Sequence, residues 1–281
     1  MADNNSGTYA VKSVDTGKVF TFKTLIDVGD YLNIDSSYAG KLSKRNGIYN
    51  RHLLFRIENN DNVSVIMNNV LVIADIHEPF CHKDYMGFCK RIYDKYKCNR
   101  VVFIGDIIDN HYTSFHDVDP DGNSAAEELR RAKENIAKWY ELFPNAYVCL
   151  GNHDVRNDRK SFNAGISKVW IKTLADVLET PNWIYNDSFV LDGVLYTHGI
   201  NQVVENRMFK NLMSCVQGHY HSKSNITYSV GDNIRLFGMQ LGCGVDEKSY
   251  AMAYNKFGNK MHINCGVVLD NGKQPIIIYM D

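Results

Sequence analysis

The stretch GNHD at residues 151–154 directly follows the apolar run AYVCL at 146–150. A run without polar alternation is typical of a short strand that is covered on both faces. This strand is therefore expected to end in an amide, an imidazole and a carboxylate. Four further apolar runs end in the same way, in Asp75 and His77, in Asp106 and Asp109, in His198, and in His219 and His221.

Predicted helical stretches lie between the first three apolar runs in chain order. Residues 83–97 and 123–142 are such stretches, so strands and helices alternate, as in a β-α-β arrangement with largely parallel strands. From residue 184 onward the pattern predicts hairpins, which turn at Asp192-Gly193, around Gly231-Asp232 and at Asn271-Gly272. The carboxyl ends of strands in α/β sheets gather at one edge. We therefore expect the polar clusters to converge there.

The converging groups would be carboxylates, imidazoles and one amide oxygen, without a thiolate. This set suits two divalent ions rather than a closed structural zinc site, provided that one carboxylate bridges the ions. Two ions about 3.5–4 Å apart hold a hydroxide that attacks phosphorus, polarise a phosphoryl oxygen and neutralise charge in the transition state. The pattern thus indicates metal-dependent hydrolysis of a phosphoester.

The motifs D-x-H, G-D-x-x-D, G-N-H-D, a single H and G-H-x-H occur in this order between residues 70 and 221. Together they resemble the calcineurin-like metallophosphoesterase family, and in particular a phage-type member of that family. The resemblance implies an α/β fold of the four-layer αββα type, with two mixed β-sheets flanked by helices. It implies Mn²⁺ as the metal, with Zn²⁺, Fe²⁺ or Ni²⁺ as alternatives. The implied ligands are Asp75, His77, Asp106 and His221 for a first ion, and Asp106, Asn152, His198 and His219 for a second.

The same resemblance assigns catalytic roles to His153, which would protonate or stabilise the leaving oxygen, and to Asp154, which would orient that imidazole. Asp109 is expected to orient a neighbouring metal ligand. Many relatives carry an arginine after Asp109, where Asn110 stands in this chain. The candidates to hold substrate oxygens instead are His111, His116, Arg156 and Arg159.

The N-terminal residues 1–62 differ in character from residues 63–281, which carry the phosphoesterase motifs. The alternating pattern predicts a hairpin, then a helix capped by Thr24 and a second helix from Ser36 or Ser37 to about residue 44. This arrangement is similar to small helix-turn-helix repeats found beside phage and intron-encoded nucleases, where the second helix reads the duplex. Alternatively, the positive charges of residues 1–62 only form a solvated surface. The basic residues expected to contact DNA or RNA are Lys41, Lys44, Arg45 and Arg51.

The overall composition limits the kinds of partner. Lys plus Arg number 31 and Asp plus Glu 32, so a net charge of -1 gives no global field, and any affinity for nucleic acid must be local. Seven cysteines without a CxxC spacing favour reduced thiols. No signal-peptide pattern and no apolar stretch of ~20 residues is present, so we expect no membrane partner. The expected location is the cytoplasm, which is the host cytoplasm if the chain is phage-encoded.

The leading hypothesis is a phosphoesterase that acts on nucleic acid, as a nuclease or an end phosphatase. One alternative is a phosphomonoesterase or cyclic phosphodiesterase that acts on nucleotides or phosphoproteins. Another is a metal-scaffolded nucleic-acid-binding protein without turnover, but such a protein is expected to have lost His153 or Asp154, and both are present. The sequence leaves the oligomeric state open.

Overall fold

The computed structural model describes residues 6–13, 19–43, 48–49, 52–57, 67–114, 122–232, 234–249 and 260–280. The chain divides into two compact units, Met1–Met67 and Asn68–Asp281. The predicted boundary between residues 62 and 63 lies outside the described residues. No helix in the described ranges combines the length and the apolar character that crossing a bilayer requires.

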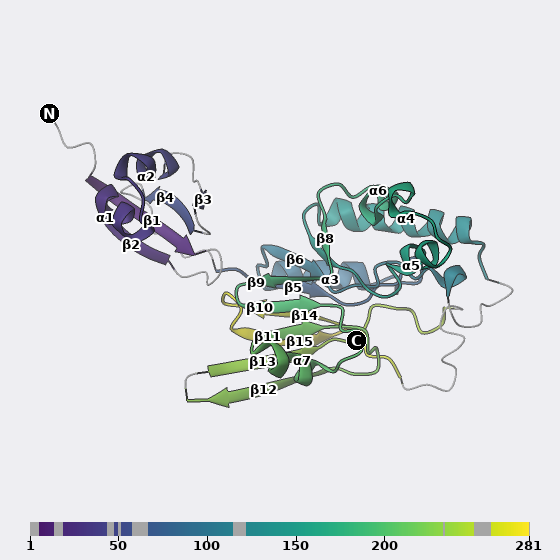
Figure 1. Ribbon diagram of the computed structural model, residues 1–281. Helices are drawn as coiled ribbons and strands as arrows, with labels where there is room; N and C mark the ends of the chain where they lie inside the picture. The colour runs from purple at the N-terminus through teal and green to yellow at the C-terminus, as the bar shows by residue number, and fades with distance from the viewer. Residues whose placement is uncertain are drawn as a thin grey trace. The chain divides into compact units, whose positions relative to one another are not determined.

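The larger unit contains a six-stranded sheet in the order β15-β14-β5-β6-β7-β8 (Figure 1). Strands β5 to β8 run parallel, whereas β14 pairs antiparallel with β5 and with β15. All residues of β5 are buried, as expected for an apolar run without alternation. The strands are β5 (Val70–Ile73), β6 (Arg100–Phe103), β7 (Tyr147–Cys149), β8 (Ile184–Asn186), β14 (Asn264–Leu269) and β15 (Gln274–Tyr279).

A second, five-stranded sheet has the order β12-β13-β11-β10-β9. Strands β10 and β13 run parallel to β11, and the three predicted hairpins, β9-β10, β12-β13 and β14-β15, are confirmed. In the first hairpin, Asp192 and Gly193 have φ values of 50° and 78°, the left-handed values that a tight two-residue turn requires. The strands are β9 (Ser188–Leu191), β10 (Val194–Thr197), β11 (Ser214–Gln217), β12 (Asn225–Gly231) and β13 (Ile234–Gln240).

The two sheets pack face to face between helices, which gives four layers (Figure 1). Val70 and Val72 lie in the core between the sheets, while Leu71 and Ile73 pack against helices, because successive side chains of a strand face opposite ways. The predicted αββα architecture is confirmed. Helices α3 (Tyr85–Lys95), α4 (Ala125–Leu142) and α6 (Leu174–Leu178) cover the six-stranded sheet, and α7 (Val204–Asn211) covers the other.

Three shorter elements connect these layers. The 3₁₀ turn η1 (His111–Thr113) follows β6. Helix α5 (Arg156–Asn163) and the 3₁₀ turn η2 (Lys168–Trp170) follow β7 and precede α6. The segments that continue from the GNHD motif are therefore α5 and η2.

The smaller unit has a four-stranded sheet in the order β2-β1-β4-β3 and two helices, so the predicted hairpin and helix pair are confirmed. Thr24 caps the first helix, since its side chain accepts the N–H of Asp27 at 3.1 Å, and Asn33 ends the helix in the left-handed conformation. Tyr9 and Val28 belong to the small core. The elements are β1 (Ser6–Ser13), β2 (Val19–Thr24), α1 (Leu25–Leu32), α2 (Ser36–Ser43), β3 (Ile48–Tyr49) and β4 (His52–Ile57).

Candidate metal centre

The predicted metal ligands each lie within four residues of the end of a strand, and the structure brings them together. They follow β5, β6 and β7 of one sheet and β10 and β11 of the other, which are parallel within each sheet. A site at the carboxyl ends of parallel strands is usual for α/β proteins. The ligands are Asp75, His77, Asp106, Asn152, His198, His219 and His221.

Asp75, His77 and His221 form the first cluster, in which the ligand atoms all lie within 4.8 Å of one another. His221 Nε2 is 3.2 Å from Asp75 Oδ2. Two buried atoms of this cluster, Asp75 Oδ1 and His77 Nε2, have no hydrogen-bond partner within the described ranges. Leaving such atoms unpaired is costly, and one divalent cation would satisfy both. The cluster therefore fits a metal ion.

Asp106, His198 and His219 form the second cluster, within the same 4.8 Å limit. His198 Nε2 is 3.1 Å from Asp106 Oδ2, 3.0 Å from Asn152 Oδ1 and 3.2 Å from His219 Nδ1. Two ligands of one ion, each about 2.1 Å from it and roughly 90–110° apart, are about 3.0–3.4 Å from each other. The spacing around His198 Nε2 therefore suits ligands of one ion.

Asp106 stands between the two clusters. Its Oδ2 atom is 3.1 Å from His198 Nε2 of the second cluster and 3.6 Å from His77 Nε2 of the first. Its Oδ1 atom accepts the backbone N–H of His153 at 2.8 Å, which fixes the rotation of the carboxylate. One carboxylate oxygen directed at both clusters is what a bridged pair of ions needs.

Hydrogen bonds to the far side of two imidazoles direct their other nitrogen to the centre. His77 Nδ1 is 2.6 Å from Asp109 Oδ1, and His198 Nδ1 is 3.0 Å from the carbonyl oxygen of Ile104. Each contact favours a proton on Nδ1 and leaves the Nε2 lone pair for a cation. Asp109 therefore contacts a predicted ligand, in the position expected of an orienting group.

The backbone at three predicted ligands has the left-handed conformation that residues other than glycine rarely adopt. The φ angle is 46° at His77, 48° at Asp106 and 73° at His219. Such conformations cost about 1–3 kcal/mol each and concentrate at functional sites. The geometry of the centre is thus maintained against a local backbone preference.

Two glycines of the motifs allow ligands from other strands to approach closely. A Cβ atom at Gly151 would lie 2.1 Å from Asp106 Oδ1, and one at Gly218 would lie 2.2 Å from Asp75 Oδ1. Real Cβ atoms essentially never come closer than 3.0 Å to other atoms. The glycines in GNHD and GHxH therefore provide the space that the two carboxylates occupy.

The electrostatics of the centre favour ionised partners. Burial disfavours a charge on Asp106, but His198 and His153 outweigh this effect and hold the pKa of Asp106 well below its usual range. Burial lowers the pKa of His198, but Asp106 and Asp75 raise it to about 9. Asp106 is therefore ionised, and a cation bound at His198 Nε2 would displace the proton that the raised pKa of His198 favours there.

His153 lies beside the centre and is oriented by Asp109. Its Nε2 atom is 4.0 Å from Asp106 Oδ2, and its Nδ1 atom is 2.6 Å from the carbonyl oxygen and 3.3 Å from Oδ1 of Asp109. Burial lowers the pKa of His153, but Asp106 and Asp109 raise it above the ordinary value. A protonated imidazole in this position can donate to an oxygen bound at the centre.

Asp154 does not contact the His153 ring, contrary to the role expected from the sequence. Its Oδ1 atom accepts the N–H groups of Ile107 and Ile108 at 3.0 and 3.3 Å, and its Oδ2 atom accepts that of Gly151 at 2.8 Å. Asp154 thus ties the loop after β6 to the loop after β7. Burial raises the pKa of Asp154 to about 7.

Arg156, a candidate substrate residue, is only 7% exposed and contacts the catalytic candidate. Its Nη1 atom donates to the carbonyl oxygens of Asp109 and Asn110 at 3.0 and 3.2 Å, and its Nη2 atom is 2.8 Å from His153 Nε2. The guanidinium group therefore lies beside Asn110, the position where many relatives carry an arginine.

His111 is buried, and its predicted contact with substrate stays a prediction. Its ring lies 3.8 Å from Asp109 Oδ2, and its backbone N–H donates to Glu128 Oε1 at 2.7 Å. Sequence analysis did not identify Glu128, because nothing in the sequence connects α4 with this loop. His116 lies outside the described residues, and Arg159 is exposed on α5.

The basic residues predicted to contact nucleic acid are only partly described. Lys41 is exposed on α2 of the smaller unit. Lys44, Arg45 and Arg51 lie outside the described residues. The nucleic-acid interface of this unit therefore stays a prediction.

Comparisons with known proteins give a family match and several structural similarities. A family model described as calcineurin-like phosphoesterase matches residues 69–237. The structure of a metallophosphoesterase from Sphaerobacter thermophilus is 12% identical, covering 76% of this chain and 88% of that chain, with a TM-score of 0.42. Vacuolar Protein Sorting 29 from Cryptosporidium parvum is 16% identical, covering 75% and 89%, with a TM-score of 0.42. The nuclease MPE from Pseudomonas putida is 11% identical, covering 74% and 87%, with a TM-score of 0.35.

A comparison with curated proteins finds no match. The family model covers more than half of the chain, and its matched residues include every predicted ligand. The two clusters offer the carboxylate, imidazole and amide donors that divalent ions bind. This protein therefore belongs to the calcineurin-like phosphoesterase family and is a metal-dependent phosphoester hydrolase.

Proposed function

We propose that this chain is a dinuclear metal-dependent phosphoesterase that acts on nucleic acid, as a nuclease or an end phosphatase. The observation that carries the proposal is the position of Asp106 Oδ2, which is 3.6 Å from His77 Nε2 and 3.1 Å from His198 Nε2. A carboxylate shared by two ligand sets suits two ions acting on one phosphoryl group.

In this proposal the ligands divide as the resemblance implies. Asp75, His77 and His221 would hold one ion together with Asp106, and Asn152, His198 and His219 would hold the other together with the same Asp106. The bound ions supply Lewis acidity and an activated water at neutral pH. Mn²⁺ is the proposed metal, and Zn²⁺, Fe²⁺ or Ni²⁺ are the alternatives that carboxylate and imidazole ligands also accept.

His153 is proposed to transfer a proton from Nε2 to the departing alcohol. Support comes from the raised pKa of His153 and from the contacts of its Nδ1 with Asp109, which point Nε2 toward Asp106. Arg156 Nη2 lies 2.8 Å from the same Nε2, and because a guanidinium can only donate, Nε2 must be unprotonated while this contact is made. We propose that this guanidinium turns to a substrate oxygen when a phosphoester binds, which frees the imidazole for proton transfer.

Residues 1–62 are proposed to be a nucleic-acid-binding domain and residues 63–281 the phosphoesterase domain of a phage-type enzyme in the host cytoplasm. Exposed Lys41 and the basic residues at 44, 45 and 51 support this targeting role. For B-DNA, each phosphate contact changes the slope of log K against log salt by roughly 0.9. A chain without residues 1–62 should therefore show a smaller slope for duplex binding. Equal slopes for the two chains would refute the targeting role.

The substrate class is tested with purified protein, quantified metal content and added Mn²⁺. Bis-p-nitrophenyl phosphate and p-nitrophenyl phosphate separate diester from monoester hydrolysis. A panel of single strand, duplex, RNA, cyclic nucleotide and phosphopeptide then identifies the natural class. The proposal expects the largest kcat/KM for a nucleic acid. A larger value for the cyclic nucleotide or phosphopeptide would refute it.

A further inference from the structure

The segment of residues 156–173, which contains α5 and η2 and follows the GNHD motif, exposes large apolar side chains. Phe162 is 81% exposed, Val169 91% and Trp170 83%. Exposed apolar side chains that gather on one surface and are rimmed by polar residues often mark a binding surface. We call these residues the α5–η2 segment.

The same segment is strongly basic, although the whole chain has a net charge of -1. Asp158 is its single acidic residue, and it lies 3.7 Å from Lys168. Four exposed positive charges against one negative charge attract a polyanion locally, and the fifth, on Arg156, is buried beside His153. The basic residues are Arg156, Arg159, Lys160, Lys168 and Lys172.

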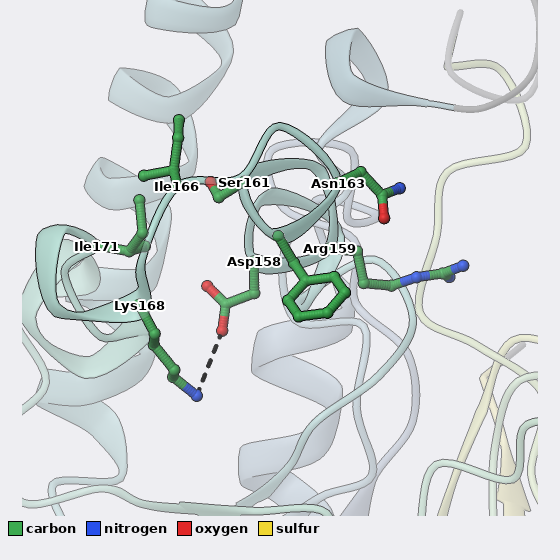
Figure 2. Close-up of a pocket in the computed structure, with 8 residues that line it drawn as sticks. Asp158, Arg159, Ser161, Asn163, Ile166, Lys168 and Ile171 are labelled. Atoms are coloured by element: carbon green, nitrogen blue, oxygen red, sulfur yellow. Dashed lines mark ion pairs between the residues drawn. The ribbon is translucent and has the colours of Figure 1, made fainter.

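Two cavities border the segment. One has a volume of about 330 Å³ and is lined by Phe162, Ile166 and Ile171, with Lys168 at its side (Figure 2). Figure 2 shows Ile166 and Ile171 on one side of α5, while Arg159 points to the other. The second cavity, of about 490 Å³, is lined in part by Trp170, Lys168 and Lys172. Mostly apolar cavities of roughly this size are typical of small-molecule sites and could each accept a nucleobase.

The segment begins at the catalytic candidate, because Arg156 Nη2 is 2.8 Å from His153 Nε2. A helix rises about 1.5 Å per residue, so Phe162 lies roughly 9 Å farther along α5. A bound chain of phosphates could therefore pass from the metal centre onto this segment. That distance corresponds to only a few nucleotides of a strand.

We propose that the α5–η2 segment binds single-stranded nucleic acid, with bases stacked on Phe162 and Trp170 and the backbone held by the basic side chains. The inference rests on the proposed function and specifies its substrate. Aromatic faces interleaved with positive charge match unpaired bases on a phosphate chain, whereas the bases of a duplex are already stacked. An acidic peptide would use the charges but not the aromatic faces, and a second copy would bring like charges together.

The test measures binding of a fluorescein-labelled single-stranded 12-mer to the full chain loaded with Mn²⁺, in a His153→Ala background that slows cleavage. Phe162→Ala and Trp170→Ala should each raise Kd by about 5- to 150-fold, the range for loss of one stacked base. Replacing Lys168 and Lys172 by Gln should reduce the slope of log K against log salt by about 0.7 per lost contact. Phe209→Ala on α7, where the side chain is 54% exposed, is the matched control and should leave Kd unchanged.

The inference is overturned if Phe162→Ala and Trp170→Ala bind like the parent, or if Phe209→Ala weakens binding equally. It is also overturned if the two substitutions weaken duplex binding as much as they weaken binding of the single strand. A phosphopeptide that binds more tightly than the strand, or a Trp170→Ala protein whose only change is dissociation of a dimer, would overturn it too. Hydrolysis by the His153-containing chain is scored separately. If the two substitutions weaken strand binding but the chain with His153 hydrolyses no nucleic acid, the proposed function is refuted and the inference stands. If that chain hydrolyses nucleic acid but the two substitutions leave strand binding unchanged, the inference is refuted and the proposed function stands.

Discussion

Replacing Gly151 by alanine should disable the metal centre while leaving the fold intact. The new Cβ would lie 2.1 Å from Asp106 Oδ1 and 2.4 Å from the backbone nitrogen of Asp106. Asp106 must then move by about 0.9 Å, the difference between 2.1 Å and the 3.0 Å limit of real Cβ contacts. Metal ligation tolerates deviations of only about 0.2 Å. Since Asp106 faces both ligand sets, both ions should be affected.

A misplacement of about 1 Å at reacting groups costs on the order of 10²-fold in rate. Gly151→Ala should therefore lower kcat/KM for bis-p-nitrophenyl phosphate by about that factor and reduce the metal content measured by mass spectrometry. Gly87→Ala on α3 is the matched control, because its Cβ would come no closer than 3.6 Å to another atom. A Gly151→Ala protein with the wild-type metal content and kcat/KM would refute this account of the glycine.

His153→Ala should lower kcat by about 10²- to 10⁴-fold, as loss of a general acid does, while two ions per chain are retained; unchanged turnover would exclude the residue from the mechanism. Asp109→Asn removes the carboxylate beside His77 Nδ1 and His153 Nδ1 and should weaken metal affinity or activity about 10- to 100-fold in a metal titration. Burial raises the pKa of Glu128 from its ordinary 4.5 to about 7. Protonated Glu128 therefore contributes to the free energy of unfolding in full below pH 4.5, and this contribution is lost as the pH rises through 7, the pKa in the folded protein. Glu128→Gln should therefore stabilise the protein by about 2–3 kcal/mol more at pH 8 than at pH 5 in denaturant unfolding, and equal effects at both pH values would contradict this.

The α/β architecture was predictable because it depends on local properties of short stretches. The run at 70–73 is apolar at every position, and all residues of β5 are buried. The Asp192-Gly193 pair predicts a hairpin because both residues tolerate a left-handed conformation, which they adopt. Burial on two faces and turn geometry can therefore be predicted from the local sequence.

The direction of a side chain beyond the end of its strand cannot be predicted from the local sequence in this way. Asp154 turns its carboxylate to backbone N–H groups 46 and 47 residues away, although His153 is its neighbour in sequence. The backbone N–H of His111 is bound by Glu128, 17 residues farther along the chain. Both contacts join loops to distant segments, so sequence order could predict which residues gather but not which of them touch.

The metal centre concentrates buried charge that the protein alone compensates only in part. Asp75 and Asp106 are almost inaccessible, and Asp75 Oδ1 has no hydrogen-bond partner in the described part of the chain. The carboxylates raise the pKa of His198 to about 9, which favours a proton on the nitrogen that a cation needs. Protons and metal ions therefore compete for the same atom, and metal affinity should rise with pH up to that pKa. The left-handed backbone at Asp106 and His219 adds a further cost. Ions bound only by the folded chain would offset these costs and stabilise the fold through the side chains that ligate them.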